Sequence, residues 1–483
     1  MISSSPINQK EKHYSHWYAV ATVCIGAFMA ALDASIINVA LPNLEQQFHT
    51  GMNEIEWVSL SYLLSLAATI LIFGRLADMF GRRWLYTIGF IIFSFSSLFC
   101  GLAPTLTILI VCRVFQGIGA AMLQANSVSI ITFAAPKDDL GKAIGFQASA
   151  QGIGLSLGPV AGGILLSFVG WKWLFFINLP VGIIGTVLGI IFLPKDPVVD
   201  KRKKFDYVGV LLLIPSIITI IYILNMGLKL GWGSSLMIIC YVIAITASYL
   251  FIKYESKKTE PLVDLSLFKH LPFTMGNITG IMSFIVMYAV LLLTPYYLDQ
   301  VKHLQVLQAG IVITAVPIGM TISTPISGIM SDHRGPAIPS IIGLSMATAG
   351  ALILSFIDIT GTYILTCVGL LLIGAGIGMF TPPNNSHVMG NVPKSALGVA
   401  GGILNMSRTL GMSLGITLGG LTYQFFLRLY GNIHFNNLVY TFRSAYFLVA
   451  VFSFVTLIIT SRNYKNELKN MDGYSSNEVG LNR

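Results

Sequence analysis

Fourteen apolar stretches of about 20 residues each are the dominant feature of this sequence. A helix of this length crosses the hydrocarbon core of a bilayer, where every backbone group must be satisfied within the segment. Only 10% of the residues are charged and 54% are apolar, which excludes an ordinary soluble protein. The sequence therefore predicts an all-α integral membrane protein. The predicted spans are roughly 17–41, 55–74, 84–103, 106–127, 143–168, 174–193, 207–226, 235–253, 272–295, 309–330, 337–356, 362–383, 397–420 and 441–460.

The basic residues of the loops predict the orientation of these spans. Most of the 29 Lys and Arg residues lie in loops on the same side as the two termini, including KRKK at 201–204. The opposite loops hold only Lys172, Lys229, Lys302, Arg428 and Arg443. By the positive-inside rule both termini are cytoplasmic and the protein spans the plasma (inner) membrane. We expect membrane lipid, and no nucleic acid, to contact this charge.

The sequence offers no motif for covalent, redox or metal chemistry. All five cysteines lie in apolar runs without CxxC spacing or clustered histidines, so neither a disulfide nor a metal site is predicted. It contains no P-loop, GxSxG, HExxH or strand-linked GxGxxG motif. We expect no enzyme, no ATP-driven pump and no cofactor.

Two features recur at nearly the same offset along the chain. GRLADMFG at 74–81 and GIMSDHRG at 328–335 share the spacing G-x-x-x-D-x-x-G. A second set of glycines, Gly411, Gly415 and Gly419, repeats the spacing of Gly154, Gly158 and Gly162. We therefore predict two parallel six-helix bundles, 17–193 and 272–460, a plan typical of secondary transporters that rock around a central site. Residues 194–271 add cytoplasmic loops and two inserted helices (207–226 and 235–253), and 1–16 and 461–483 form cytoplasmic tails.

The stretch GLSLGPVAGG at 154–163 predicts a close helix contact. Gly154, Gly158 and Gly162 share one helix face, so another helix backbone can approach it closely. Pro159 and Gly163 belong to the same stretch. We expect the neighbour to come from the other bundle.

Charged residues inside a span are costly and are functional candidates by default. Asp33 lies about 12 Å and Arg113 about 10 Å from the outer ends of their helices, from a rise of about 1.5 Å per residue. At equal depth the two can form an ion pair, and protonation of Asp33 would release Arg113 and favour one transport state. The alternative is a permanent ion pair that only orders the two helices.

Arg408 is the third charged residue inside a span, near the middle of 397–420. It either contacts substrate or gates a path, or it bonds carbonyls beside the repeated glycines. Further candidates for the lining of a cavity are polar residues within or beside spans, which could equally serve helix packing. They are Asn38, Gln116, Gln124 and Tyr288, with Asn384 and Asn385 after a predicted break at Pro382–Pro383. Because the later spans lack carboxylates, a monocation, zwitterion or neutral amphiphile fits such a cavity better than a dication.

The loop after the second span predicts a conformational latch. Gly74 and Gly81 allow a tight turn, and Asp78 can accept helix N-terminal amides and pair with Arg82 or Arg83. The second copy supplies Asp332. The alternative is an ordinary solvated basic loop.

Three stretches resemble the signature motifs of drug:proton antiporters of the major facilitator superfamily. They are GRLADMFGRR at 74–83, RVFQGIGAAML at 113–123 and GIGLSLGPVAGG at 152–163. WKWLFFINLPVG at 171–182 and the stretches TPPNNSHVMG and GVAGGILNMSRTLG within 381–411 resemble the fourteen-helix branch of the EmrB/QacA type. The resemblance implies a major facilitator fold with two six-helix bundles plus two inserted helices.

The resemblance also implies an activity. Relatives of this kind are antiporters that export small amphiphilic, hydrophobic or cationic compounds in exchange for protons, which gives multidrug efflux and antibiotic resistance. Asp33 would then hold the proton with Arg113 as its partner, and Gly158 and Pro159 would belong to the motif associated with export. Some relatives work with a periplasmic adaptor protein, which nothing in this sequence indicates. The alternatives are an exporter of one metabolite, siderophore or amino acid, and a sensor or scaffold without transport.

Overall fold

The computed structural model describes residues 16–136, 139–194, 206–258, 261–358, 363–393, 397–431 and 435–480, except the side chains of Asp78, 397–398, 435–436 and 466–480. The described part contains α-helices, one short 3-10 helix and no strand. The helices are α1 (His16–Phe48), α2 (Met52–Ile55), α3 (Trp57–Phe80), α4 (Arg82–Leu102), α5 (Leu106–Ala134), α6 (Leu140–Phe168), α7 (Trp173–Phe176), α8 (Asn178–Phe192), α9 (Tyr207–Leu230), α10 (Ser235–Glu255), η1 (Leu265–Lys269), α11 (Leu271–Gln300), α12 (Val306–Ile313), α13 (Ala315–Arg334), α14 (Ala337–Ser355), α15 (Ile364–Gly390), α16 (Leu397–Tyr430) and α17 (Phe435–Gly480).

Fourteen helical segments of the described chain are long and apolar enough to cross a membrane, which confirms the predicted all-α membrane fold. Three of them are interrupted: α2 with α3, α7 with α8, and α12 with α13. The predicted break at Pro382–Pro383 is wrong, because α15 continues through both prolines to Gly390. Neighbouring helices can satisfy the backbone groups that a proline frees within a bundle. The basic residues that the sequence places on the cytoplasmic side and that lie outside the described residues are Lys10, Lys12, Lys137, Lys195, 201–204, Lys394 and Arg483.

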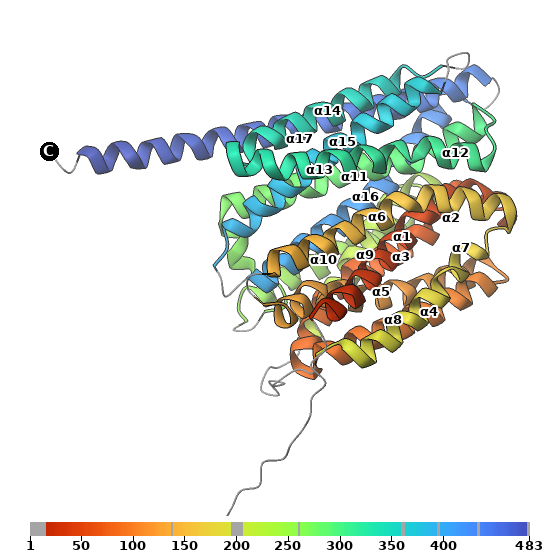
Figure 1. The fold of residues 1–483 in the computed structure, drawn as a ribbon. Coiled ribbons are helices and arrows are strands. Elements are labelled where there is room, and N and C mark those ends of the chain that lie inside the picture. Colours follow the sequence, from red (N-terminus) through yellow and green to blue (C-terminus); the bar gives the residue numbers. More distant parts are fainter. Residues whose placement is uncertain are drawn as a thin grey trace, which may run out of the picture.

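The same pairs of spans pack together in the first and the second part of the chain. Contacts join α1 to α6, α3 to α5, α4 to α5 and α4 to α8. In the later part, contacts join α11 to α16, α13 to α15, α14 to α15 and α14 to α17. In Figure 1 the helices α11 to α15 and α17 lie above α1 to α8, and α16 reaches toward the lower group. The pairing follows the repeat offset in the sequence.

The glycines of α6 and α16 occupy matching positions, but their neighbour corrects the sequence prediction. A Cβ at Gly154 would lie 3.1 Å from Ala31 of α1, and a Cβ at Gly158 would overlap Ser35 of the same helix. Gly411, Gly415 and Gly419 face α11 in the same way. The expected partner from the other bundle is therefore wrong for Gly154, Gly158 and Gly162, which pack on α1 of their own group.

Gly163 and Pro159 do meet the later helices. A Cβ at Gly163 would lie 3.3 Å from the Val306 carbonyl oxygen, and a Cβ at Gly310 would lie 2.7 Å from the Pro159 carbonyl oxygen. At the other end of the same helices, a Cβ at Gly145 of α6 or at Gly328 of α13 would meet nothing within 4 Å. The tight contact at Gly163 is thus not repeated at these two glycines of the other end.

The two G-x-x-x-D-x-x-G segments form a helix end followed by a turn. Gly81 (φ 100°) ends α3 and Gly335 (φ 76°) ends α13, both in the region that favours glycine. The predicted role of Gly74 in the turn is wrong, because it lies within α3. Arg82 begins α4, Arg83 donates to the Ile190 carbonyl of α8, and Asp332 is exposed at the end of α13. The Asp78 side chain lies outside the description, so the latch stays a prediction.

Helix α9 is anchored by a buried polar contact. Asn225 donates to Glu56 (2.7 Å) and accepts from the Trp57 indole (2.9 Å). Glu56 is fully buried, and a Cβ at Gly420 of α16 would overlap its carboxyl group. The contact therefore joins α9 to α3 close to α16.

Replacing Asn225 with Leu is expected to lower stability by roughly 2 kcal/mol, since it leaves the Glu56 carboxyl and the Trp57 N–H buried without that partner. Thermal unfolding of the detergent-purified protein measures the change. Lys229→Gln is the control on the same helix, because it removes only the half-exposed ion pair with Glu54. Equal unfolding midpoints for the two variants would contradict this role of Asn225.

Candidate functional site

Asp33 and Arg113, predicted to lie at equal depth, form an ion pair between α1 and α5. The Arg113 Nη1 donates to the Asp33 Oδ2. Both side chains are removed from solvent, with exposed fractions of 0% and 1%. An ion pair in such a place persists only if the remaining donors and acceptors are also satisfied.

Three further polar side chains complete what we call the Asp33 cluster: Ser97 of α4, Gln116 of α5 and Asn178 at the start of α8. Gln116 and Asn178 both donate to the Asp33 Oδ1, at 2.8 and 2.9 Å. The two amides also contact the Ser97 hydroxyl at 3.1 and 3.0 Å. The carboxylate thus accepts hydrogen bonds on both oxygens from two elements besides its own helix.

The Arg113 guanidinium has further partners besides Asp33. Arg113 donates its Nε to the Val58 carbonyl (2.8 Å) and an Nη1 hydrogen to Gln116 (2.8 Å). The Tyr62 ring lies 4.3 Å from the guanidinium carbon, at the distance of a cation–π contact. Protonation of Asp33 would remove one charge of this pair and weaken the link between α1 and α5.

The cluster corrects one prediction and adds two residues. Gln116 was expected to line a cavity, but it is fully buried beside Asp33, because its helix position turns it toward Arg113 one turn earlier. Ser97 and Asn178 were not singled out. The signal for Asn178 was an amide in an otherwise apolar span, within WKWLFFINLPVG.

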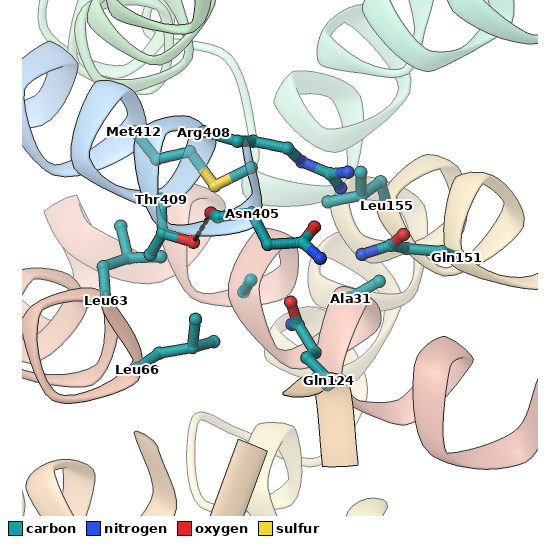
Figure 2. A pocket seen from close by; sticks show the side chains of 12 residues that line it. Ala31, Leu63, Leu66, Gln124, Gln151, Leu155, Asn405, Arg408, Thr409 and Met412 are labelled. Carbon is teal, nitrogen blue, oxygen red and sulfur yellow. Dashed lines mark hydrogen bonds between the residues drawn. The ribbon is translucent and has the colours of Figure 1, made fainter. Parts of the chain in front are cut away.

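A pocket lies between helices of the first part of the chain and α16 of the later part (Figure 2). We call it the central pocket. Helices α1, α3, α5, α6 and α16 contribute to it. Its lining is Ala30, Ala31, Ala34, Leu63, Leu66, Gln124, Gln151, Leu155, Asn405, Arg408, Thr409 and Met412.

The other predicted lining residues fall on two adjoining pockets. Asn38 and Tyr288 line a second pocket with Pro159 and Leu155, and Leu155 also belongs to the central pocket. Asn384 and Asn385 line a third, which shares Arg408 with the central pocket. Asn384 also donates to the Gly276 carbonyl at 3.1 Å, so it serves packing as well.

Helices α1 and α5 each carry residues of both the Asp33 cluster and the central pocket. On α1, Ala30, Ala31 and Ala34 line the central pocket, while Asp33 lies among them in sequence and turns toward α5. On α5, Gln124 reaches the pocket two turns beyond the cluster. The two helices that the ion pair joins therefore also line the central pocket.

No group of three or more His, Cys, Asp or Glu side chains that could hold a metal ion is found in the described part of the chain.

Comparison with known proteins fits this architecture. The profile of the Major Facilitator Superfamily matches residues 23–416. A bacterial homologue of the human lysosomal transporter Spinster, solved in an inward-facing and unoccupied conformation, superposes with a TM-score of 0.67 at 17% identity over 94% of this chain and 98% of that one. The chain belongs to the Major Facilitator Superfamily and is a multi-pass membrane transporter.

Two curated relatives narrow the similarity. The riboflavin transporter RibZ of Clostridioides difficile is 36% identical over 92% of this chain and 96% of its own length. The multidrug resistance protein Stp of Mycobacterium tuberculosis is 32% identical over 82% of this chain and 74% of its own length.

Proposed function

We propose that this chain is a proton-coupled antiporter that exports small amphiphilic compounds across the plasma membrane by alternating access. The observation that carries the proposal is the buried Asp33–Arg113 ion pair on the two helices that also line the central pocket. A proton on Asp33 loosens α1 from α5, and a ligand in the pocket acts on the same helices. Proton and substrate binding can therefore compete for one conformational change.

The repeated pairing of spans and the contacts of Gly163 support the alternating-access part of the proposal. We take 17–193 and 272–460 as the two moving bundles and place both termini in the cytoplasm. The tight contact of Gly163 with α12 then lies at the outer end, and the open space at Gly145 and Gly328 lies at the inner end. Helices α6 and α12 are then closed against each other on the outer side, while α3 and α16 also meet near the inner side, where a Cβ at Gly402 would lie 2.9 Å from Leu71.

Multidrug export is the first candidate activity, in the fourteen-helix branch of the EmrB/QacA type. The likeness to the multidrug resistance protein Stp and the apolar side of the central pocket support it. Export of one metabolite is the second candidate, and the likeness to a riboflavin transporter over nearly the whole of both chains supports it.

An efflux assay tests the proposal and separates the two candidates. Cells that express the chain are loaded with riboflavin or with members of a dye and drug panel, and efflux is followed with and without a protonophore. Protonophore-sensitive efflux of several unrelated compounds would support multidrug export, and efflux of riboflavin alone would support metabolite export. Efflux of either kind that a protonophore leaves unchanged would contradict proton coupling.

A further inference from the structure

We propose that the central pocket selects flat compounds with an acceptor-rich edge, either a neutral imide or a carboxylate, and discriminates against cations. The proposal rests on the proposed transport function, and it names the chemistry of the compound that is transported. Four polar side chains carry it: Gln124 of α5, Gln151 of α6, and Asn405 and Arg408 of α16.

These four side chains converge on one space and are available to a ligand. Figure 2 shows the three amide groups pointing toward one another, with the Arg408 guanidinium next to them. None of the four side chains forms a hydrogen bond or ion pair with another described residue. A guanidinium offers five N–H donors and each amide offers two more together with one acceptor. The pocket therefore presents mostly donors.

The charge of the lining points the same way. The described lining contains Arg408 and no carboxylate. The carboxylate of Asp33 cannot serve a ligand there, because it is fully buried and both of its oxygens are hydrogen-bonded within the Asp33 cluster. A cation in the pocket would meet an uncompensated positive charge, whereas a carboxylate or an imide edge would meet a matching fork of donors.

The shape of the pocket favours a flat body. The small side chains of Ala30, Ala31 and Ala34 leave the α1 side of the pocket without protruding groups. Leu63, Leu66 and Met412 supply apolar contacts. The Phe284 ring lies 5.3 Å from the Arg408 guanidinium carbon, which supports one face of that group and leaves its edge to a ligand. A fused aromatic ring with carbonyls on one edge can pack its faces on the apolar side chains and accept hydrogen bonds from the amides and Arg408 along that edge.

Binding to the purified full-length chain tests the proposal without any proton gradient. The three probes are flat and fluorescent: lumichrome (a neutral imide), 9-anthracenecarboxylate (a carboxylate) and ethidium (a cation). We expect lumichrome or 9-anthracenecarboxylate to bind at least about tenfold more tightly than ethidium, and Arg408→Gln to remove about tenfold of that affinity. Arg428→Gln is the matched control, since it removes an exposed arginine from the same helix and should change nothing.

A second variant keeps the test valid if Arg408→Gln fails to fold. Gln124→Glu preserves shape and places a carboxylate in the pocket, so we expect it to weaken lumichrome and 9-anthracenecarboxylate and to strengthen ethidium. Tighter binding of lumichrome would identify an imide as the group that the pocket recognises, and tighter binding of 9-anthracenecarboxylate would identify a carboxylate. Ethidium binding as tight as theirs to the unmodified protein, or affinities that neither Arg408→Gln nor Gln124→Glu changes, would overturn the proposal. Failure of proton coupling would leave all these affinities intact, so the two ideas fail separately.

Discussion

Asp33→Asn is expected to lower proton-driven transport by roughly a hundredfold or more, the scale of losing an essential proton-transfer group. The asparagine amide cannot take up and release a proton, so the change that loosens α1 from α5 cannot be driven by protons. Uptake of a transported probe into inverted membrane vesicles under an imposed pH gradient measures the rate. Uptake at the rate of the unmodified protein would contradict the coupling role of Asp33.

The control must separate lost coupling from lost folding. Removing one member of a buried ion pair leaves the other charge uncompensated and costs about 3–5 kcal/mol. The double variant Asp33→Asn with Arg113→Gln removes both charges, so we expect it to recover stability without recovering proton-driven transport. A double variant that regains transport would show that the pair only orders the two helices, which is the alternative reading of the sequence.

Gly158→Leu is expected to destabilise the protein by roughly 3 kcal/mol or more, through overpacking against α1. Any side chain at this position meets Ser35 and the Ile36 backbone, and the latter lies 2.9 Å from the position of an added Cβ. Binding and transport are then lost together. Yield of monodisperse protein and the thermal unfolding midpoint measure the effect.

Two glycines of the same helix serve as comparisons. Gly152→Leu enters open space and should fold normally. Gly163→Leu meets α12 of the other group at 3.3 to 3.4 Å, so we expect it to fold and to slow transport by hindering closure at that end. If Gly158→Leu instead folds like Gly152→Leu and binds its ligand without transporting it, the glycines of α6 act as a sliding surface during transport.

These comparisons also indicate which features could be predicted from the sequence. The lengths of the apolar stretches were sufficient to predict the number of spans. The distances of Asp33 and Arg113 from their helix ends were sufficient to predict that the two lie at the same depth and form a pair. Both quantities depend only on position along one helix. The partner of Gly158 could not be predicted, because a row of glycines marks a close contact without identifying the helix that makes it.

The same limit explains the polar residues that were assigned wrongly or not at all. Gln116 and Gln124 both lie on α5, yet one belongs to the Asp33 cluster and the other to the central pocket. Their separation into two sites depends on which helices surround each turn of α5. Asn178 became recognisable only when the interruption between α7 and α8 placed it beside Asp33.

Substrate-linked proton movement in liposomes is the most direct test of the account. The purified protein is reconstituted with a pH-sensitive dye inside, and a compound that it transports is added outside without any imposed gradient. We predict a change of internal pH with the unmodified protein and none with Asp33→Asn, although both bind the compound. Transport by the unmodified protein without any pH change, or an unaltered pH change with Asp33→Asn, would contradict proton coupling through this carboxylate.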